Sequence, residues 1–299
     1  IPFYHLYRRY LKIDITVEYF MVLEDNTGMA DFHTSLLDAV NVRITTRMYE
    51  DEKIDSDLSR QLRQNIDAVN LISGLHMQLI ENCPQVFARA NAEGHFRNAQ
   101  NFIALIGPAG SDEAREAAGY YGERVVLSAV LMGLQTGWVA GSWDKAEAEC
   151  CCDISDNEEL FLGIVIGYQE GYSALMEEPY EQRCETQRTH RPSKSADALF
   201  PATTAAGAAS AGTAAHPSAE PPQWFMDGAA AAAKAPSAMN RQPAMFSYDP
   251  GSGSVEAYIG GRDSTMFAYT DLGIAKLHFQ IGAGGGSWEW GNRGAFSQR

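Results

Sequence analysis

The stretch Asn41–Tyr49, NVRITTRMY, carries residue types that could bind an anion. Arg43 and Arg47 are four residues apart, and Thr45 lies between them. On a helix the two arginines share one face, whereas near a helix start or in an extended turn all three side chains can converge. Two guanidiniums and a hydroxyl suit a phosphate, because the planar guanidinium matches two of its oxygens. The alternative is a solvated basic face at the start of a helix, which the spacing alone favours.

Length and charge bound the classes of protein to which the chain can belong. It has 299 residues, a formal net charge of −15 and 45% hydrophobic residues, enough for one large core or two halves. The acidic balance argues against nucleic acid or an anionic membrane surface as the main partner. The longest apolar runs, such as FIALIG and LFLGIVIGY, are too short to span a bilayer, so no membrane partner is expected.

The five cysteines do not resemble a disulfide framework, because their number is odd and three of them are contiguous. A reducing cytoplasm is therefore the expected location. Neighbouring cysteines point in different directions and lack the spacing of zinc ligands, so we interpret them as ordinary thiols and expect no metal site. Three scattered histidines are interpreted as structural. These residues are Cys83, Cys150, Cys151, Cys152, Cys184, His76, His95 and His278.

Hydrophobic periodicity predicts the elements that must position the candidate residues. Gly74 allows a break in the second helix, Pro236 ends an alanine-rich helix, and the turn PGSG indicates a hairpin. The segment 136–143 is a strand or a loop. The pattern predicts helices over 34–41, 56–82, 112–133, 223–235 and 271–286, and strands over 102–107, 160–168, 244–249 and 254–260.

The same pattern divides the chain into parts. Residues 1–28 mix aromatic, basic and acidic residues without a period, and we expect an N-terminal extension outside the core. A first half over 29–175 and a second over 223–299 flank a linker, 176–222, whose segment 201–222 is of low complexity. Residues 123–134 loosely match residues 271–282, which indicates an internal duplication.

Three motifs resemble those of the nitroreductase family of flavoproteins, in the branch where two nitroreductase-like halves are fused in one chain. They are RxTxRxY over 43–49, APSxxNxQP over 235–243, and a helix-to-strand signature over 121–141 that has Ala140 where glycine is common. The resemblance covers roughly 30–175 and 188–299. It implies an α+β fold: a pseudo-dimer of two α/β halves with central antiparallel-type sheets flanked by helices.

The resemblance also implies FMN as the cofactor. In the family, arginines from one subunit and the PSxxN loop from the other meet at one flavin. Here the first half holds RxTxR and only a degenerate counterpart of the loop, NLISGLHMQ, while the second half holds APSAMNRQP and lacks RxSxR. The complementary halves therefore predict one FMN site per chain, so that a monomer is expected and a homodimer is possible.

Roles follow by resemblance for individual residues. Arg43 and Thr45 would hold the FMN phosphate, Arg47 would lie near the ribityl chain or the N1–O2 edge of the ring, and Ala140 and Gly141 would present backbone N–H groups to N5. The loop residues Pro236, Ser237, Asn240 and Gln242 would come from the other half, Arg191 and Lys194 would reach the phosphate, and Asn98 would meet the pyrimidine edge. For Arg191 and Lys194 a merely solvated position, and for Asn240 a turn cap, are the alternatives.

The implied function is an NAD(P)H oxidoreductase with ping-pong kinetics. Hydride from NAD(P)H would reach flavin N5 and then pass to a nitroaromatic, a quinone or another small acceptor, and no side chain is needed as a general base. Thr45 in place of serine and Ala140 in place of glycine depart from the family pattern. They leave open a second hypothesis, a non-enzymatic flavin-binding protein.

Overall fold

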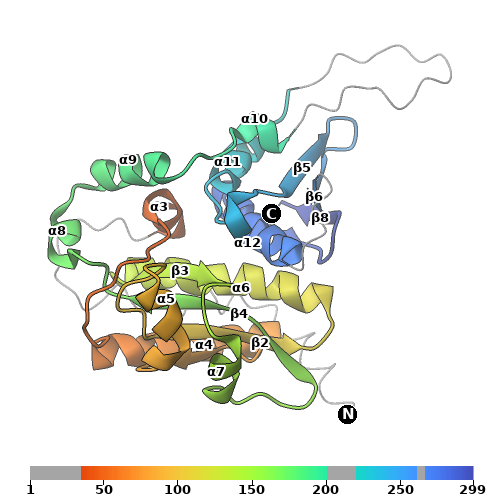
Figure 1. Cartoon of the computed structure of the whole chain (residues 1–299). Coiled ribbons are helices and arrows are strands. Elements are labelled where there is room, and N and C mark those ends of the chain that lie inside the picture. Colours follow the sequence, from red (N-terminus) through yellow and green to blue (C-terminus); the bar gives the residue numbers. More distant parts are fainter. Residues whose placement is uncertain (1–34, 201–219, 261–266, 299) are drawn as a thin grey trace. The chain divides into compact units, whose positions relative to one another are not determined.

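A computed structural model describes residues 35–200, 220–260 and 267–298, which belong to one compact unit. The expected extension over 1–28 and most of the low-complexity segment lie outside the described residues. Helices and two four-stranded antiparallel sheets make up the described part, as the α+β class predicts (Figure 1). The interpretation as a pseudo-dimer of two halves stays a prediction.

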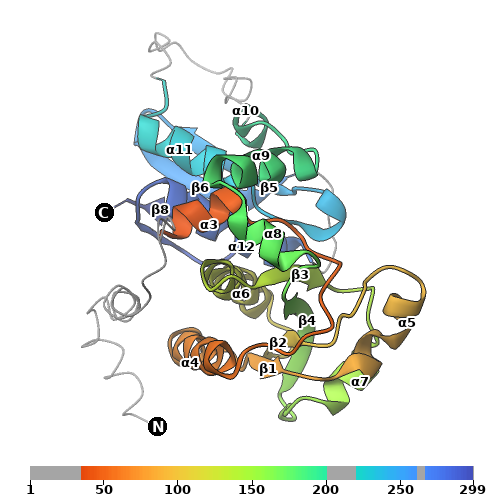
Figure 2. The same cartoon turned by 90° about the vertical axis from the view of Figure 1, so that its left-hand side faces the viewer.

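The first sheet has the strand order β1-β2-β4-β3 and is buried on both faces. In β2, Ile103 and Leu105 face α4 and α6, while Phe102 and Ala104 face η2, α5 and α7 (Figure 2). Successive side chains of a strand point to opposite faces, so a strand covered on both sides reads as a continuous apolar run. Its elements are α4 (Ser56–Ser73), β1 (Gln78–Ile80), η2 (Pro84–Phe87), α5 (Ala88–Ala92), β2 (Phe102–Pro108), α6 (Asp112–Leu131), β3 (Gln135–Val139), α7 (Lys145–Cys150) and β4 (Glu158–Gly167).

The second sheet has the order β5-β6-β8-β7, with helices on one face. Phe246, Val255 and Phe296 pack against Phe225 and Phe279 of its helices, and the strands alternate buried with more exposed positions. The predicted hairpin is confirmed, with β5 and β6 paired in register. The elements are α11 (Gln223–Ala232), η3 (Ala238–Asn240), β5 (Ala244–Asp249), β6 (Ser254–Ile259), α12 (Ala268–Gly282), β7 (Ser287–Trp288) and β8 (Gly294–Ser297).

The two sheets have the same topology. In each, a central helix, α6 or α12, connects the second strand to the third, and the fourth strand lies between those two strands in the sheet. The central helices α6 and α12 cross in backbone contact. A Cβ added to Gly119 would lie 2.0 Å from the Thr270 carbonyl oxygen, and one added to Gly273 would lie 2.0 Å from the Glu116 carbonyl oxygen. At the crossing, Gly119 and Gly273 therefore occupy corresponding positions. The loose sequence match instead aligns Glu123 with Asp271, so the two correspondences differ.

Local signals set the helix ends. The carboxylate of Asp55 caps α4, and Gly74 ends it at φ 72° in the left-handed region that favours glycine. The break at Gly74 is therefore real, and the rest of the predicted helix contains the short strand β1. The predicted helix over 112–133 is confirmed as α6, which Ser111 caps.

The segment 176–200 differs from the expected linker, because it contains helices, and the helix over 180–190 packs beside α3 (Leu36–Val42). Tyr180 donates a hydrogen bond to Asp38 and accepts one from Asn41, and Arg183 is buried. Polar contacts hold the helix over 180–190, which explains why it shows no hydrophobic period, whereas Leu199 packs into the core beside Phe225. None of the described helices is long and apolar enough to cross a bilayer. The helices of this segment are α8 (Tyr172–Glu177), α9 (Tyr180–His190) and α10 (Ala196–Leu199).

Candidate functional site

The segment after α3 is extended and runs beside the edge strand β3. Thr45 pairs with Thr136 in a parallel bridge, and the Thr46 N–H donates to the Thr136 carbonyl at 2.9 Å. In an extended chain alternate side chains share a face, which places Arg43, Thr45 and Arg47 on one side. The extended turn, and not the helix face, is thus the geometry of the first motif.

The loop of the second motif is folded tightly over the start of α12. The Ala238 N–H donates to the carboxylate of Asp271 at 3.0 Å, and the Gln242 N–H donates to the Ser237 hydroxyl at 2.8 Å. Met239, Asn240 and Gln242 all have φ near the left-handed region, at 51°, 55° and 50°. Hydrogen bonds from two directions maintain this backbone conformation, which is unusual for residues other than glycine.

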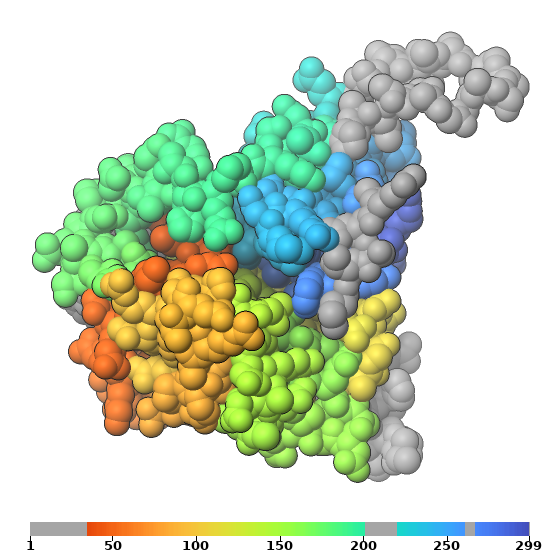
Figure 3. Space-filling view, viewed as in Figure 1, coloured from red at the N-terminus to blue at the C-terminus, as the bar shows by residue number. Residues whose placement is uncertain are grey.

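The segment after α9 crosses this loop. The Asn240 side-chain amide donates to the Pro192 carbonyl at 2.7 Å, and Lys194 Nζ donates to the Gln242 carbonyl at 2.7 Å. Figure 3 shows the green segment that follows α9 beside the light-blue segment that leads into β5. Asn240, Gln242 and Lys194 therefore join the two segments to each other.

A cleft lies where these three segments meet. Of the predicted residues, Arg43, Thr45, Arg191, Pro236, Ser237 and Asn240 line it, whereas Arg47, Ala140, Gly141, Lys194, Gln242 and Asn98 do not. Its other lining residues are Ile44, Gln187, His190, Ser193, Lys234 and Ala235, and its volume is about 50 Å³. The two sequence motifs, although far apart in the chain, thus form two walls of one cleft.

Arg43 forms part of the cleft although only 5% of its surface is exposed. Its Nε lies 3.3 Å from Glu123 Oε1, within ion-pair distance but without the alignment of a hydrogen bond, and one terminal nitrogen donates to the Lys234 carbonyl at 3.4 Å. Burial lowers the pKa of Arg43, and Glu123 opposes this shift. A guanidinium stays charged in proteins, so Arg43 gives the cleft a cation. The Nε–H of this cation donates no hydrogen bond.

Cations are concentrated around Arg43. Partial burial, and then Arg191, lower the pKa of Arg47, while Tyr49 raises it. Partial burial, and then Arg191, Arg43 and Arg47, lower the pKa of His190, against a hydrogen bond to the Thr45 backbone that raises it. Cations held this close to one another repel, and an anion placed among them would reduce that repulsion.

The acid closest to the cleft is already surrounded. Glu123 of α6 is fully buried; it accepts a hydrogen bond from Trp138 at 2.8 Å, and its other oxygen lies 2.9 Å from Nε2 of His278. His278, on α12, is also fully buried, as expected for a structural histidine. Glu123 is therefore shared between Arg43, Trp138 and His278, so its charge compensates Arg43 only in part.

The remaining predicted residues have other environments. The Arg47 guanidinium lies over the Phe96 ring at 5.5 Å, and the Asn98 amide donates to the Tyr49 carbonyl at 3.0 Å, beside a separate hollow. Ala140 and Gly141 follow β3, and a Cβ added to Gly141 would meet nothing within 4 Å. The backbone at Gly141 is therefore open to close approach.

Sequence reasoning missed His190, Lys234 and Glu123 as parts of the site. His190 directly precedes the predicted Arg191, so the HRPSKS segment contained a signal that was overlooked. Lys234 and Glu123 carried no such signal, because only folding brings the end of α11 and the middle of α6 to the same place.

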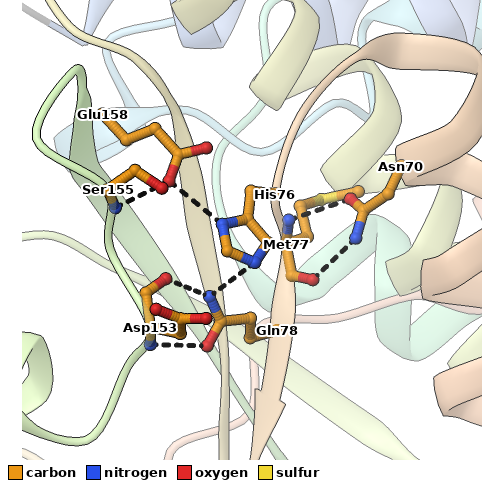
Figure 4. Close-up of polar contacts among 7 residues, drawn as sticks. All are labelled: Asn70, His76, Met77, Gln78, Asp153, Ser155 and Glu158. Carbon is orange, nitrogen blue, oxygen red and sulfur yellow. Dashed lines mark hydrogen bonds and ion pairs between the residues drawn. The ribbon is translucent and has the colours of Figure 1, made fainter.

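His76 belongs to a polar cluster that shares no residue with the lining of the cleft (Figure 4). Its Nδ1 lies 3.0 Å from Glu158 Oε2, and its Nε2 lies 3.2 Å from the Gln78 amide, which also donates to the Asp153 carbonyl. These bonds tie the start of β1 to the loop before β4, so His76 has a structural role. Among the described residues, no group of three side chains is arranged to hold a metal ion.

Comparison with known proteins gives a family and a fold. A family model described as "Putative TM nitroreductase" matches residues 35–283. A crystal structure of a putative nitroreductase from Thermotoga maritima has 16% identity and a TM-score of 0.55, covering 91% of this chain and 97% of that one. A putative nitroreductase in complex with FMN from Desulfovibrio desulfuricans has 18% identity and a TM-score of 0.36, covering 48% of this chain and 96% of that one. No curated protein matches.

Proposed function

The chain belongs to this family of nitroreductases, and we propose that it is an FMN-dependent oxidoreductase that takes hydride from NAD(P)H and reduces a small acceptor. One observation carries the proposal: a cationic cleft made by the RxTxR segment, the APSxxN loop and the end of α9. Similar proteins are described in words that name this cofactor, as "FMN-dependent nitroreductase" and "in complex with FMN".

The residues of the cleft fit the phosphate end of FMN. Arg43 has a buried Nε without a hydrogen-bond partner, and Arg191 and Lys234 add positive charge nearby. A volume of about 50 Å³ suits an anion but is well below the roughly 300–1,000 Å³ of pockets for larger ligands. The flavin ring would therefore need space beyond this cleft, and only the phosphate end is accounted for.

The protein groups would bind and orient the cofactor, which supplies the hydride chemistry when bound. Arg43, Arg191 and Thr45 would hold the phosphate, and Pro236, Ser237 and Asn240 would contact the cofactor from the other half. Arg47, whose guanidinium lies over the Phe96 ring, would stabilise negative charge at the N1–O2 edge of the flavin. The open backbone at Ala140 and Gly141 suits close approach of a flat ring. We keep the cytoplasm as the proposed location.

The test is spectroscopic. The purified full chain is mixed with FMN, freed of excess ligand, and examined for a bound flavin spectrum before and after anaerobic addition of NADH or NADPH. Bleaching of bound flavin, and its return on addition of a quinone or nitroaromatic, is the expected result. Bound flavin that never bleaches would support the alternative, a non-enzymatic flavin-binding protein, and a chain that binds no FMN would contradict both.

A further inference from the structure

His190 is the one titratable group that lines the described cleft and can change its charge near neutral pH. Arg43, Arg191 and Lys234 line the same cleft. We propose that His190 takes up a proton when an anion binds in this cleft, and that the resulting imidazolium is part of the anion site. For FMN the inference rests on the proposed function, but it applies to any phosphate or sulfate group in the cleft.

The geometry gives His190 a fixed place. It is the last residue of α9 and lines the cleft together with Thr45, whose backbone raises the pKa of the ring. The C-terminal end of a helix carries the negative end of the helix dipole, which favours cations such as His190 and Arg191 there. His190 thus lines the cleft and is also exposed to solvent.

The charged groups around the ring come from every neighbouring element, and most are cations. Arg191 follows it directly, Arg43 and Arg47 approach from the segment after α3, and Lys234 approaches from the end of α11. The neighbouring acids have other partners. Glu123 lies beside Arg43 and is bonded to Trp138 and His278, Asp38 of α3 accepts from Ser35 and Tyr180, and Glu185 of α9 pairs with Arg188.

This surrounding determines the direction of the coupling. Without an anion, burial and the neighbouring arginines lower the pKa of His190, so the ring is mainly neutral near pH 7. An anion in the cleft offsets the repulsion and raises the pKa of the same ring. Anion affinity must then increase as the pH falls through the interval between the two pKa values, by at most about tenfold per pH unit for one coupled proton.

Sulfate is the appropriate probe, because a phosphate group has its own pKa near 6 and would obscure the proton balance. The dissociation constant of sulfate is measured by thermal shift at constant ionic strength from about pH 5.5 to 8, the range in which histidine changes its charge. Wild-type affinity should rise several-fold with falling pH, whereas His190→Gln should bind sulfate with little pH dependence. His95→Gln, an exposed histidine beside Glu93, is the matched control and should behave as wild type.

A second measurement needs no variant to fold. The seven histidines are followed by NMR in the wild-type chain, and sulfate should raise the pKa of one of them while leaving the others in place. Equal pH dependence in wild type and His190→Gln, no sulfate binding, or no histidine that responds to sulfate would each overturn the inference. Sulfate binding coupled to His190 without FMN binding would contradict the proposed function alone, and FMN binding unaffected by His190 would contradict the inference alone.

Discussion

Arg43 shows how one residue of the first motif differs from an ordinary surface arginine. Its guanidinium is almost fully buried, lies beside Glu123 and still lines the cleft. A buried cation is tolerated only where charges and hydrogen bonds compensate it. Glu123 gives incomplete compensation, since the Nε has no hydrogen-bond partner. An anion in the cleft would provide the rest.

We expect Arg43→Ala to weaken FMN binding by about 1.5–3 kcal/mol, the scale of a hydrogen bond to a charged group. Riboflavin, which lacks the phosphate, should lose much less affinity. Titration calorimetry with both ligands measures the difference on folded protein. The control is Arg97→Ala, an exposed arginine paired with Glu170 outside the cleft. An unchanged FMN affinity in Arg43→Ala would show that the motif assignment is wrong.

Glu158 gives a prediction for pH dependence that is independent of the cleft. Burial would raise its pKa, but hydrogen bonds from Ser155 and His76 outweigh burial and lower it (Figure 4). A carboxyl whose pKa is lowered in the folded state contributes stability above its unfolded pKa of about 4.3, and this stability is lost as the pH falls through the folded value.

Glu158→Gln should therefore be less stable than wild type at pH 7 and lose this difference in acid. Urea unfolding at several pH values between neutrality and about pH 3 measures it. If the free-energy difference between the two proteins is the same at all pH values, Glu158 makes no contribution through its charge.

Among the elements, α6 and α12 depend on two glycines where they cross. An alanine Cβ at Gly119 would lie 2.0 Å from the Thr270 carbonyl oxygen, a backbone atom that cannot rotate away. The helices must separate, and overpacking of this kind costs about 1–3 kcal/mol or more. Denaturant unfolding of Gly119→Ala should show this loss, whereas Gly141→Ala, whose Cβ would meet no neighbour, should unfold like wild type. Equal stability of all three proteins would mean that the crossing is looser than described.

A thiol pair connects η2 with the end of α7, so the cysteines are not all isolated. Cys83 and Cys151 have their sulfurs 2.9 Å apart and are both free thiols. We expect oxidised glutathione to convert them to a disulfide with release of two molecules of reduced glutathione. Because burial and the contact with Cys83 raise the pKa of Cys151 to about 11, the reaction should be slow near neutrality and faster at higher pH.

Mass spectrometry of peptides from the oxidised chain should show the Cys83–Cys151 link. Cys83→Ser should abolish it, and Cys184→Ser should leave it intact, since Cys184 is on α9. A glutathione adduct at Cys83 without an internal disulfide would contradict the prediction.

For the whole molecule, the repeated strand order in the two sheets supports the interpretation of two related halves. The described cleft takes the RxTxR segment from one half and the APSxxN loop from the other. We therefore expect one FMN per chain, measured as the ratio of flavin absorbance to protein in the saturated complex, with light scattering to give the number of chains. Two flavins per chain would show that the degenerate motif NLISGLHMQ still forms a site.

The amino-acid sequence by itself determined the elements that depend on local turn and cap residues, and the strands that are continuously apolar. FIALIG is a continuous apolar run because both faces of its strand are buried. Gly74 ends its helix because glycine adopts a φ of 72° more easily than other residues do, and PGSG forms the turn of the hairpin. The two motifs also identified Arg43, Thr45, Pro236, Ser237 and Asn240, which line the cleft, because each motif is a contiguous stretch that keeps its local shape.

Tertiary structure decided what depends on contacts between distant segments. The polar helix α9 has no hydrophobic period and is held by Tyr180 and its partners, so no pattern predicted it. Burial of Arg43 beside Glu123, and the convergence of His190 and Lys234 on the same cleft, arise only when α6, α9 and α11 come together. Charge repulsion and burial act through space and not along the chain, which is why only the folded protein shows that Arg43, Arg191 and Lys234 line the same cleft.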